Sequence, residues 1–506
     1  SMFFGQFNVY NAITRPSERL FISFTQSDFS GKSLLPSSII EKINRLFPNV
    51  KTTCLKSPET ARLMLNSQTA FLQNMGAAMK LPEGNIFKQA YKYIKSGAPV
   101  CRKAAIMTKS EDYGKINGLL SEKTANEYFG RSIYSSISRL EKFASCPYMY
   151  FMSYTMGAKD RPIYQINTPD LGILFHAVLE DFSKELEKSG TSWENTNPEQ
   201  IEEIISTSVD NISSSIGGDL FLSSNTTKYL VKRLKRISVR TVSTLIDHVK
   251  SGAFTPYSFE LKFGSGQLPP IVLDIGGGKK MYLMGKVDRV DILDENGSIY
   301  VKIIDYKSGG KKFSLQDIYY GLQLQLIIYL DAIIKSGLFK GNDVIPGGVF
   351  YFNIKDPIIK SIDELTADDI KRLIEKELKM SGLVLMNENV IRGIDKYFEK
   401  SSDIIPISYK SDGNLSQTSS AIDFKGFNAI MDYCLKTASS LGKEIVKGNI
   451  SPSPFVSGGK TPCLYCAYKS VCPFDSDIHK GRNLKSINKD DIINIIENSE
   501  DSVENQ

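Results

Sequence analysis

The pattern of apolar and polar residues along the chain predicts long amphipathic helices on either side of a group of strands. Apolar residues recur at helical spacing in four long segments, so we expect helices over residues 171–188, 198–216, 225–251 and 425–447. Shorter segments rich in Val, Ile, Phe and Tyr predict strands at residues 257–263, 271–275, 281–293, 298–306 and 348–354. The strands therefore lie in the middle of the chain.

A local motif predicts a further helix before the first of these four. Ser138-Arg139-Leu140-Glu141 has the sequence of a capping box, in which the serine and the glutamate satisfy backbone groups at a helix start. We expect a helix that begins there, continues to about Gly157 and carries Cys146 on its face.

Three polar residues on predicted helices are candidates for a site. Residues 319–330 are apolar on nearly all sides, which predicts a buried helix, and Gln325 and Tyr329 lie one turn apart in it. Buried polar groups need partners, so this pair either faces an active site or makes structural contacts. His176, one turn before Glu180, is either a ligand or a hydrogen-bonded histidine on a half-buried helix.

A hairpin with two aspartates is the most informative feature of the chain. Asn296-Gly297 lies between the predicted strands 281–293 and 298–306, and Asn-Gly is the strongest short signal for a two-residue turn. With these residues at the turn, Asp288 lies directly opposite Asp305, with Cβ atoms roughly 4.5 to 5.5 Å apart.

This pairing of acids points to a metal ion. Two carboxylates that face each other across a sheet repel, so the arrangement is costly unless a cation lies between them. Carboxylate oxygens favour Mg²⁺ or Mn²⁺. Lys307 shares the face of Asp305 because side chains alternate along a strand. The hairpin therefore predicts a metal-dependent nuclease site, and a solvated face with scattered charges is the alternative.

Four of the seven cysteines have the spacing of metal ligands. Cys463, Cys466 and Cys472 follow the pattern C-x₂-C-x₅-C, and three thiolates make an incomplete tetrahedral or cluster site. Cys146 is the best candidate for a fourth ligand, since it is followed by proline, as Cys472 is. Spacing leaves zinc, an iron-sulfur cluster and a fortuitous set of free thiols open. A metal here would be a structural staple that closes a long loop. The remaining cysteines are expected to be small buried side chains: Cys54, Cys101 and Cys434.

The composition is that of an ordinary globular protein with more than one domain. A chain of 506 residues exceeds a single core, so two or three domains are expected. The net charge of +6 permits a nucleic-acid partner without requiring one. No apolar run reaches the roughly 18 residues of a membrane span, and no signal peptide is evident, so we expect a cytoplasmic protein. The Ser1-Met2 start resembles a tag remnant, and we expect a fragment of a longer protein.

Together these motifs resemble a known family. Their order is Cys146-Pro147, Gly172 to His176, Gly285-x-x-Asp288-Arg289, Asp305-Tyr306-Lys307, Gln325-x-x-x-Tyr329 and C-x₂-C-x₅-C. The combination is similar to the iron-sulfur RecB-type nucleases of the PD-(D/E)XK superfamily. It is most similar to the C-terminal part of the B subunits (AddB) of AddAB-type (RexAB) ATP-dependent helicase-nucleases. The proline that precedes the first acid in the superfamily is absent, since Val287 stands there.

The resemblance implies an α/β fold, with a restriction-endonuclease-like mixed sheet flanked by helices and additional helical regions. Residues 1–130 would hold a helicase-like remnant and a helical linker region, and residues 10–16 resemble the last helicase-type motif. Residues 131–480 would form the iron-sulfur PD-(D/E)XK nuclease domain, and residues 481–506 a C-terminal tail.

The resemblance also implies roles for individual residues. The implied ligands of a [4Fe-4S] cluster are Cys146, Cys463, Cys466 and Cys472. The implied ligands of Mg²⁺ or Mn²⁺ are His176, Asp288 and Asp305. Lys307 would orient or activate the attacking water, and Gln325 and Tyr329 would line the catalytic centre.

The implied function is that of a Mg-dependent deoxyribonuclease, with 5′-strand-type exonuclease activity, in a helicase-nuclease complex of double-strand-break repair and recombination. The implied partners are single-stranded DNA from duplex ends and the A subunit of a heterodimer, without a membrane. One alternative is a stand-alone iron-sulfur exonuclease of the CRISPR-adaptation type, against which the helicase-like N-terminus argues. Another is an inactive DNA-binding scaffold, against which the intact Asp288, Asp305 and Lys307 set argues.

Overall fold

The computed structural model describes residues 2–26, 33–52, 88–90, 92, 118–130, 132–159, 168–217, 225–359, 364–476 and 479–501. The chain divides into two compact units, Ser1–Lys115 and Ile116–Gln506. The described helices of the first unit include α1 (Met2–Thr14) and α2 (Ser38–Leu46). The helicase-like interpretation of this region stays a prediction, and Cys54 and Cys101 lie outside the described residues.

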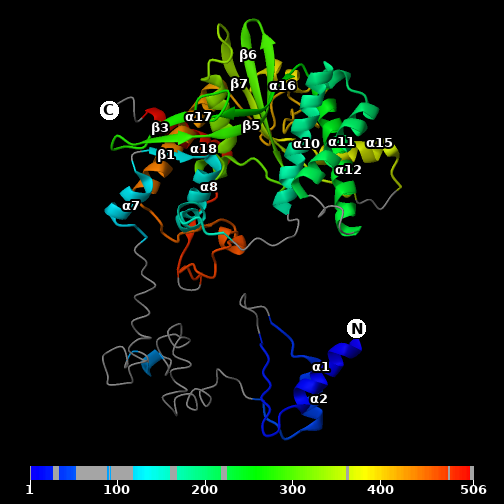
Figure 1. Cartoon of the computed structure of the whole chain (residues 1–506), viewed down its shortest axis with the longest axis vertical. Helices are drawn as coiled ribbons and strands as arrows, with labels where there is room; N and C mark the ends of the chain where they lie inside the picture. The colour runs from blue at the N-terminus through cyan, green and yellow to red at the C-terminus, as the bar shows by residue number, and fades with distance from the viewer. Residues whose placement is uncertain are drawn as a thin grey trace. The chain divides into compact units, whose positions relative to one another are not determined.

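The second unit is built on a mixed six-stranded sheet in the order β2-β5-β6-β7-β8-β9 (Figure 1). The strands are β2 (Thr255–Phe263), β5 (Gly285–Glu295), β6 (Ser298–Lys307), β7 (Asp343–Asn353), β8 (Ser381–Leu385) and β9 (Ala421–Ile422). β6 runs parallel to β7 and β8 parallel to β9, whereas the other neighbours are antiparallel. The expected α/β fold with a mixed sheet is confirmed.

A smaller sheet has the order β1-β4-β3. Its strands are β1 (Ser132–Ser135), β4 (Lys280–Leu283) and β3 (Ile271–Asp274). The single strand predicted over residues 281–293 is therefore wrong, because the chain passes at Met284 from the smaller sheet into the larger one. The apolar pattern did not reveal the break, since Leu283 before it and Val287 after it are both buried.

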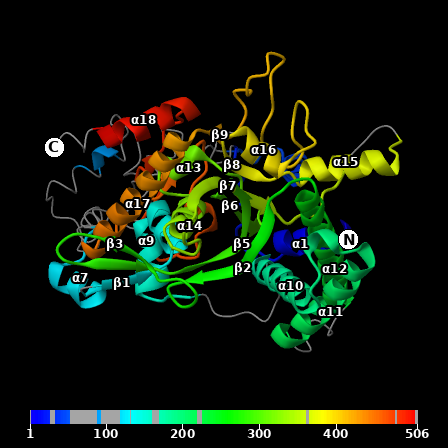
Figure 2. The same cartoon turned by 90° about the horizontal axis from the view of Figure 1, so that it is seen from above.

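Helices cover both faces of the large sheet (Figure 2). On one side, α10 (Thr168–Ser189), α11 (Pro198–Gly217) and α12 (Asn225–Lys250) form a bundle, and α10 contacts β2. On the other side, α14 (Gln325–Ile334) lies against β6 and β7, and α17 (Phe424–Val446) packs on α14 and on α8 (Ile137–Ser145). The four long helices predicted from apolar spacing are confirmed.

Shorter elements connect this framework. They are α7 (Glu122–Phe129), α9 (Pro147–Tyr150), the π-helix η1 (Phe151–Thr155), η2 (Trp193–Asn195), α13 (Leu315–Tyr319), α15 (Ala367–Glu377), α16 (Glu388–Ile394), β10 (Phe455–Val456), η4 (Pro462–Tyr465), β11 (Arg482–Asn483) and α18 (Lys489–Asp501). None of the described helices combines the length and the apolar character that a bilayer span requires.

The helix predicted from Ser138 to about Gly157 is broken at Cys146. α8 ends at Ser145, Cys146 is extended, and α9 begins at Pro147. Proline has no N–H to donate and disfavours helical geometry in the residue before it, which explains the break. The capping box is also absent, because α8 begins one residue earlier and the hydroxyl of Ser138 instead contacts that of Ser136.

The predicted buried helix over residues 319–330 is two helices rather than one. α13 ends at Tyr319 and α14 begins at Gln325, with Gly321 at a φ of 74° between them. A positive φ interrupts a right-handed helix and is readily adopted by glycine. The apolar sequence gave no sign of this turn because the turn itself is buried. Gln325 therefore lies at a helix N-terminus.

The two faces of the hairpin β5–β6 carry different chemistry, because side chains alternate along a strand. On the face toward the α10–α12 bundle, Asp291 binds the Nε of Arg289 at 2.6 Å and the Nζ of Lys302 at 3.0 Å. All three side chains are buried, and the Arg289 guanidinium lies 4.8 Å from the centre of the Trp193 ring. The opposite face carries Asp305, which contacts α14.

Candidate active site

The hairpin that carries the two aspartates has the register predicted from the sequence. Asn296 and Gly297 form its turn with φ values of 52° and 85°, and Glu295 pairs with Ser298. Positive φ at both central residues is the requirement of the turn that matches the twist of a hairpin. The pairing runs from there to Arg289 opposite Ile304, immediately before the two acids.

Asp288 and Asp305 lie just past this last pair. The backbone N–H of Tyr306 donates to Oδ2 of Asp288 at 2.8 Å, so the first acid is turned toward the strand that carries the second. Both side chains are buried. Burial raises the pKa of Asp305, the charge of Asp288 raises it further, and Lys307 acts in the opposite direction. The pair therefore has the mutual repulsion that the sequence predicted.

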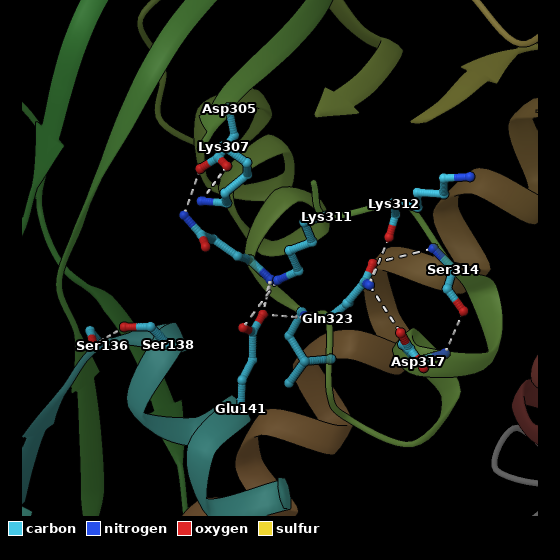
Figure 3. Close-up of polar contacts among 12 residues, drawn as sticks. Ser136, Ser138, Glu141, Asp305, Lys307, Lys311, Lys312, Ser314, Asp317 and Gln323 are labelled. Carbon is cyan, nitrogen blue, oxygen red and sulfur yellow. Dashed lines mark hydrogen bonds and ion pairs between the residues drawn. The ribbon is translucent and has the colours of Figure 1, made fainter. Parts of the chain in front are cut away.

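Each oxygen of Asp305 has a partner. Nε2 of Gln325 donates to Oδ1 at 2.8 Å, and the ammonium group of Lys307 forms an ion pair with Oδ2. Figure 3 shows Asp305 and Lys307 together at the end of the strand, above a polar cluster that includes Glu141 and Lys311. Gln325 and Lys307, both predicted site residues, thus meet at one carboxylate.

His176 reaches the same place from α10. Its Nδ1 lies 3.4 Å from Oδ2 of Asp288. Burial alone would lower the pKa of His176, but the hydrogen bond with Asp288 and the charges of Asp288, Asp305 and Glu260 raise it above its ordinary value. A histidine among carboxylates is a mixed nitrogen and oxygen donor set of the kind that holds a divalent metal ion.

Glu260 is a member of this site that the sequence analysis missed. Ligand atoms of His176, Glu260 and Asp288 all lie within 4.8 Å of one another, which suits a single metal ion. Burial raises the pKa of Glu260, and the nearby charges of Asp288 and Glu180 raise it further, whereas Lys286, its ion-pair partner, lowers it. This carboxylate therefore also favours a nearby positive charge.

The backbone of Glu260 is unusual. Its φ is 53°, in the left-handed region that costs energy for residues other than glycine. The register between β2 and β5 passes Phe259 opposite Arg289 and Leu261 opposite Val287, which brings Glu260 beside Asp288. The available signal was a glutamate between two apolar residues of a predicted strand, but its meaning depends on the pairing of two strands distant in sequence.

Tyr329, the last predicted catalytic residue, is buried next to the site. Its ring packs edge-on against Phe263 with centroids 5.1 Å apart, and the backbone N–H of Lys286 donates to its hydroxyl. Burial raises the pKa of Tyr329, and the charges of Asp305 and Asp288 contribute. The hydroxyl also lies so near Gly285 that a Cβ there would be 2.8 Å away.

The structure thus brings the predicted residues to one end of the hairpin, with one difference in their grouping. They are His176, Asp288, Asp305, Lys307, Gln325 and Tyr329. His176 and Asp288 lie in the three-residue group with Glu260, whereas Asp305 is engaged by Gln325 and Lys307. The assignment of His176, Asp288 and Asp305 as metal ligands stays a prediction.

The four cysteines with ligand spacing lie near one another. The thiol of Cys146 interacts electrostatically with those of Cys463 and Cys472, and Cys472 interacts with Cys466. All four are free thiols. The hydroxyl of Tyr148 donates to the carbonyl of Val471 at 3.2 Å, which joins the first cysteine's segment to that of the other three. Cys434 is buried apart in α17, as expected.

The prolines after two of these cysteines shape their surroundings. Burial raises the pKa of the Cys146 thiol, whereas the backbone N–H groups of Met149 and Tyr148 lower it by donating to the sulfur. Burial raises the pKa of Cys472 in the same way, and the N–H of Phe474 lowers it. Such N–H donors stabilise a thiolate, the form in which cysteine binds a metal.

Comparisons with known proteins agree with this arrangement. Residues 134–473 match the PD-(D/E)XK nuclease superfamily. The chain is 36% identical over 509 residues to the B subunit of the ATP-dependent helicase/deoxyribonuclease of Alkaliphilus oremlandii, covering 98% of this chain and 44% of that protein. It is 36% identical over 485 residues to the protein of the same name from Acetivibrio thermocellus, covering 94% and 42%. For the one from Clostridium botulinum (strain Hall), the values are 37% over 512 residues, 96% and 43%.

The chain spans less than half the length of these relatives. The superfamily match covers most of the chain and includes the hairpin with its two aspartates as well as Cys146, Cys463, Cys466 and Cys472. The chain therefore belongs to the PD-(D/E)XK nuclease superfamily.

Proposed function

We propose that this chain is the nuclease part of a helicase-nuclease subunit and hydrolyses DNA phosphodiesters with the help of a divalent metal ion. The observation that carries the proposal is the convergence of His176, Glu260 and Asp288 beside the buried Asp305 and Lys307. The relatives are named as B subunits of a helicase/deoxyribonuclease, which supports both the chemistry and the setting.

The donor set fits Mg²⁺ or Mn²⁺. Carboxylate oxygens are the preferred ligands of both ions, and one imidazole is compatible with either. The raised pKa values of Glu260 and Asp305 express a local excess of negative charge, which a cation would neutralise. His176, Asp288 and Asp305 would hold the ion together with Glu260. When bound, it would polarise the scissile phosphate and lower the pKa of a water molecule.

The surrounding residues have distinct tasks in this proposal. Lys307 is placed to orient the attacking water and to stabilise the negative charge that develops on the phosphate. Gln325 holds Oδ1 of Asp305, and the N–H of Tyr306 holds Oδ2 of Asp288, so neither carboxylate needs to reorganise during the reaction. Tyr329 lines the centre and fills the space beside Gly285.

The proposed substrate is single-stranded DNA from duplex ends, supplied by an A subunit with helicase activity in double-strand-break repair and recombination. The proposal includes 5′-strand-type exonuclease activity and a cytoplasmic location, as the sequence leads us to expect. The name of the relatives, with its two activities in one subunit, supports a helicase partner, and the net charge of +6 is compatible with DNA.

Cys146, Cys463, Cys466 and Cys472 fit a [4Fe-4S] cluster, because four thiols converge and two of them accept backbone N–H bonds. Its proposed role is structural, since it would join segments more than 300 residues apart in the chain. The test is iron and sulfide analysis of anaerobically purified protein, with Cys463→Ser beside the control Cys434→Ala. Iron retained in Cys463→Ser, or zinc in its place in the unaltered protein, would contradict the cluster.

The nuclease activity is tested with a labelled single-stranded oligonucleotide and Mg²⁺. We expect hydrolysis that EDTA stops and that Asp305→Ala abolishes, whereas Asp210→Ala, a surface acid paired with Lys235, retains it. Equal degradation by the unaltered protein and by Asp305→Ala would refute the catalytic assignment. Binding of the oligonucleotide without hydrolysis would support the scaffold alternative instead. Activity without any co-purified ATPase partner would support the stand-alone exonuclease.

A further inference from the structure

The N-terminus of α14 is capped by a residue from another helix. Oε1 of Glu141, in α8, accepts the backbone N–H of Leu324 at 2.8 Å and that of Gln325 at 3.0 Å. Leu324 precedes α14 and has no side-chain oxygen for this purpose. The first N–H groups of a helix need an acceptor, and here a carboxylate 183 residues away along the chain provides it.

The environment of Glu141 makes this cap a strong one. Its side chain is only 12% exposed, and a carboxylate at a helix N-terminus interacts favourably with the helix dipole. Hydrogen bonds from backbone N–H to an ionised carboxylate are stronger than those between neutral groups. The ammonium group of Lys311 lies 3.7 Å from Oε2, which leaves the first oxygen to α14, as Figure 3 shows for the cluster around Glu141.

Gln325 connects this cap to the candidate active site. Its backbone N–H binds Glu141, and its side-chain amide donates to Oδ1 of Asp305 at 2.8 Å. The cap therefore sets the place from which Gln325 reaches Asp305. A shift of the first turn of α14 would lengthen or break the contact with the acid.

The other end of α8 is held by the cysteine region. α8 ends immediately before Cys146. The guanidinium group of Arg482, which follows the last three cysteines in the chain, donates to the carbonyl of Ser145 at 3.1 Å and to that of Ala144. These are the final carbonyls of α8, so one short helix contacts the cysteine region at one end and α14 through Glu141.

We propose that Glu141 is a positioning residue for the nuclease reaction. It fixes the N-terminus of α14 so that Gln325 orients Asp305, and it connects the helix that ends at Cys146 to the catalytic carboxylates. This inference rests on the proposed function, because the effect of Glu141 is expressed through the hydrolysis that Asp305 supports.

The test is a double-mutant cycle measured as kcat and as the half-saturating Mg²⁺ concentration on a single-stranded oligonucleotide. We expect Glu141→Ala and Gln325→Ala each to lower kcat by about ten- to hundredfold, as loss of groups that orient ligands does. Because both act on one contact, the double variant should be about as slow as the slower single variant. Two effects that multiply in the double variant would overturn the proposal.

Three further variants separate positioning from stability. Asn387 caps α16 by accepting two backbone N–H groups, as Glu141 caps α14, so Asn387→Ala is a matched control that should lower the melting temperature but leave kcat unchanged. Glu141→Gln retains an acceptor oxygen and should recover most of the kcat that Glu141→Ala loses. Glu141→Asp is too short to reach α14 and replaces Glu141→Ala in the cycle if that variant does not fold.

The two failures are distinguishable. An unaltered protein without Mg²⁺-dependent hydrolysis refutes the proposed function. An active unaltered protein whose kcat and Mg²⁺ requirement are the same in folded Glu141→Ala refutes only the role of Glu141. Equal losses of kcat in Glu141→Ala and in Asn387→Ala also refute it, because the effect then reflects general loss of stability.

Discussion

The backbone N–H of Tyr306 donates to Oδ2 of Asp288 at 2.8 Å, so the strand that carries the second acid also orients the first. This contact lies just beyond the last backbone pair of the hairpin, Arg289 with Ile304. The spacing of the two carboxylates is therefore set by backbone geometry, and their chemistry can be altered without moving the strands.

Asp288→Asn tests this separation of geometry from charge. The amide oxygen can still accept the N–H of Tyr306, whereas the repulsion of Asp305 is removed. We expect hydrolysis to fall to background while the free energy of unfolding without metal stays equal or rises by up to about 1 kcal/mol, as for relief of like charges across a sheet. Urea denaturation in EDTA and the oligonucleotide assay measure the two effects. A clear loss of stability would mean that the negative charge itself holds the hairpin together.

Glu260 offers a second test because its backbone is strained. Glu260→Gly removes both the positive-φ penalty and a buried carboxylate, so we expect a higher melting temperature in EDTA. The same variant should need at least about tenfold more Mg²⁺ for half-maximal activity. Glu260→Gln is the control that keeps the strain and loses only the charge. An unchanged Mg²⁺ requirement in both variants would exclude Glu260 from the metal site.

The buried triad on the other face of the hairpin should be important for stability. Asp291→Ala leaves the charges of Arg289 and Lys302 buried without their partner, so we expect a loss of about 3 to 5 kcal/mol in the free energy of unfolding. Asp210→Ala breaks an exposed pair and should cost no more than about 1 kcal/mol. Chemical denaturation of the two variants side by side measures the contrast, and similar losses would contradict it.

His248 predicts a weakening of the fold in mild acid. Burial lowers the pKa of His248 to about 3, with Lys302 and Arg289 contributing, and its Nδ1 is enclosed without a hydrogen-bond partner among the described residues. The unfolded chain takes up a proton near pH 6.5, which the folded protein does not, so stability is complete above that pH and declines below it. Between pH 7 and pH 5 the free energy of unfolding should fall by about 1 to 2 kcal/mol.

His248→Leu removes this titration and serves as its control. Its urea midpoint should change less between pH 7 and pH 5 than that of the unaltered protein. Equal pH dependence of the two proteins would show that other groups cause the decline.

Local signals were sufficient for much of the fold and for part of the site. Asn296-Gly297 determined the register of the hairpin, which is why Asp288 and Asp305 were paired correctly from sequence. Apolar spacing likewise located the long helices, because each buries one face against the sheet or a neighbouring helix.

The missed features depend on contacts between distant segments. Glu260 becomes part of the site only through the pairing of β2 with β5, which no local pattern specifies. Glu141 has the position of a capping-box residue, but its carboxylate binds the N–H groups of α14 instead of its own helix. Tertiary structure decided between two acceptable partners for one side chain.

The passage of one strand from the small sheet to the large one leaves no slack in the chain before the first acid. Only four residues separate Leu283, the end of β4, from Asp288, and both strands are fixed by neighbours on either side. Since successive side chains point to opposite faces, one inserted residue here would turn Asp288 toward the Trp193 side of the sheet. The length of this connection therefore decides whether the protein has a catalytic acid at all.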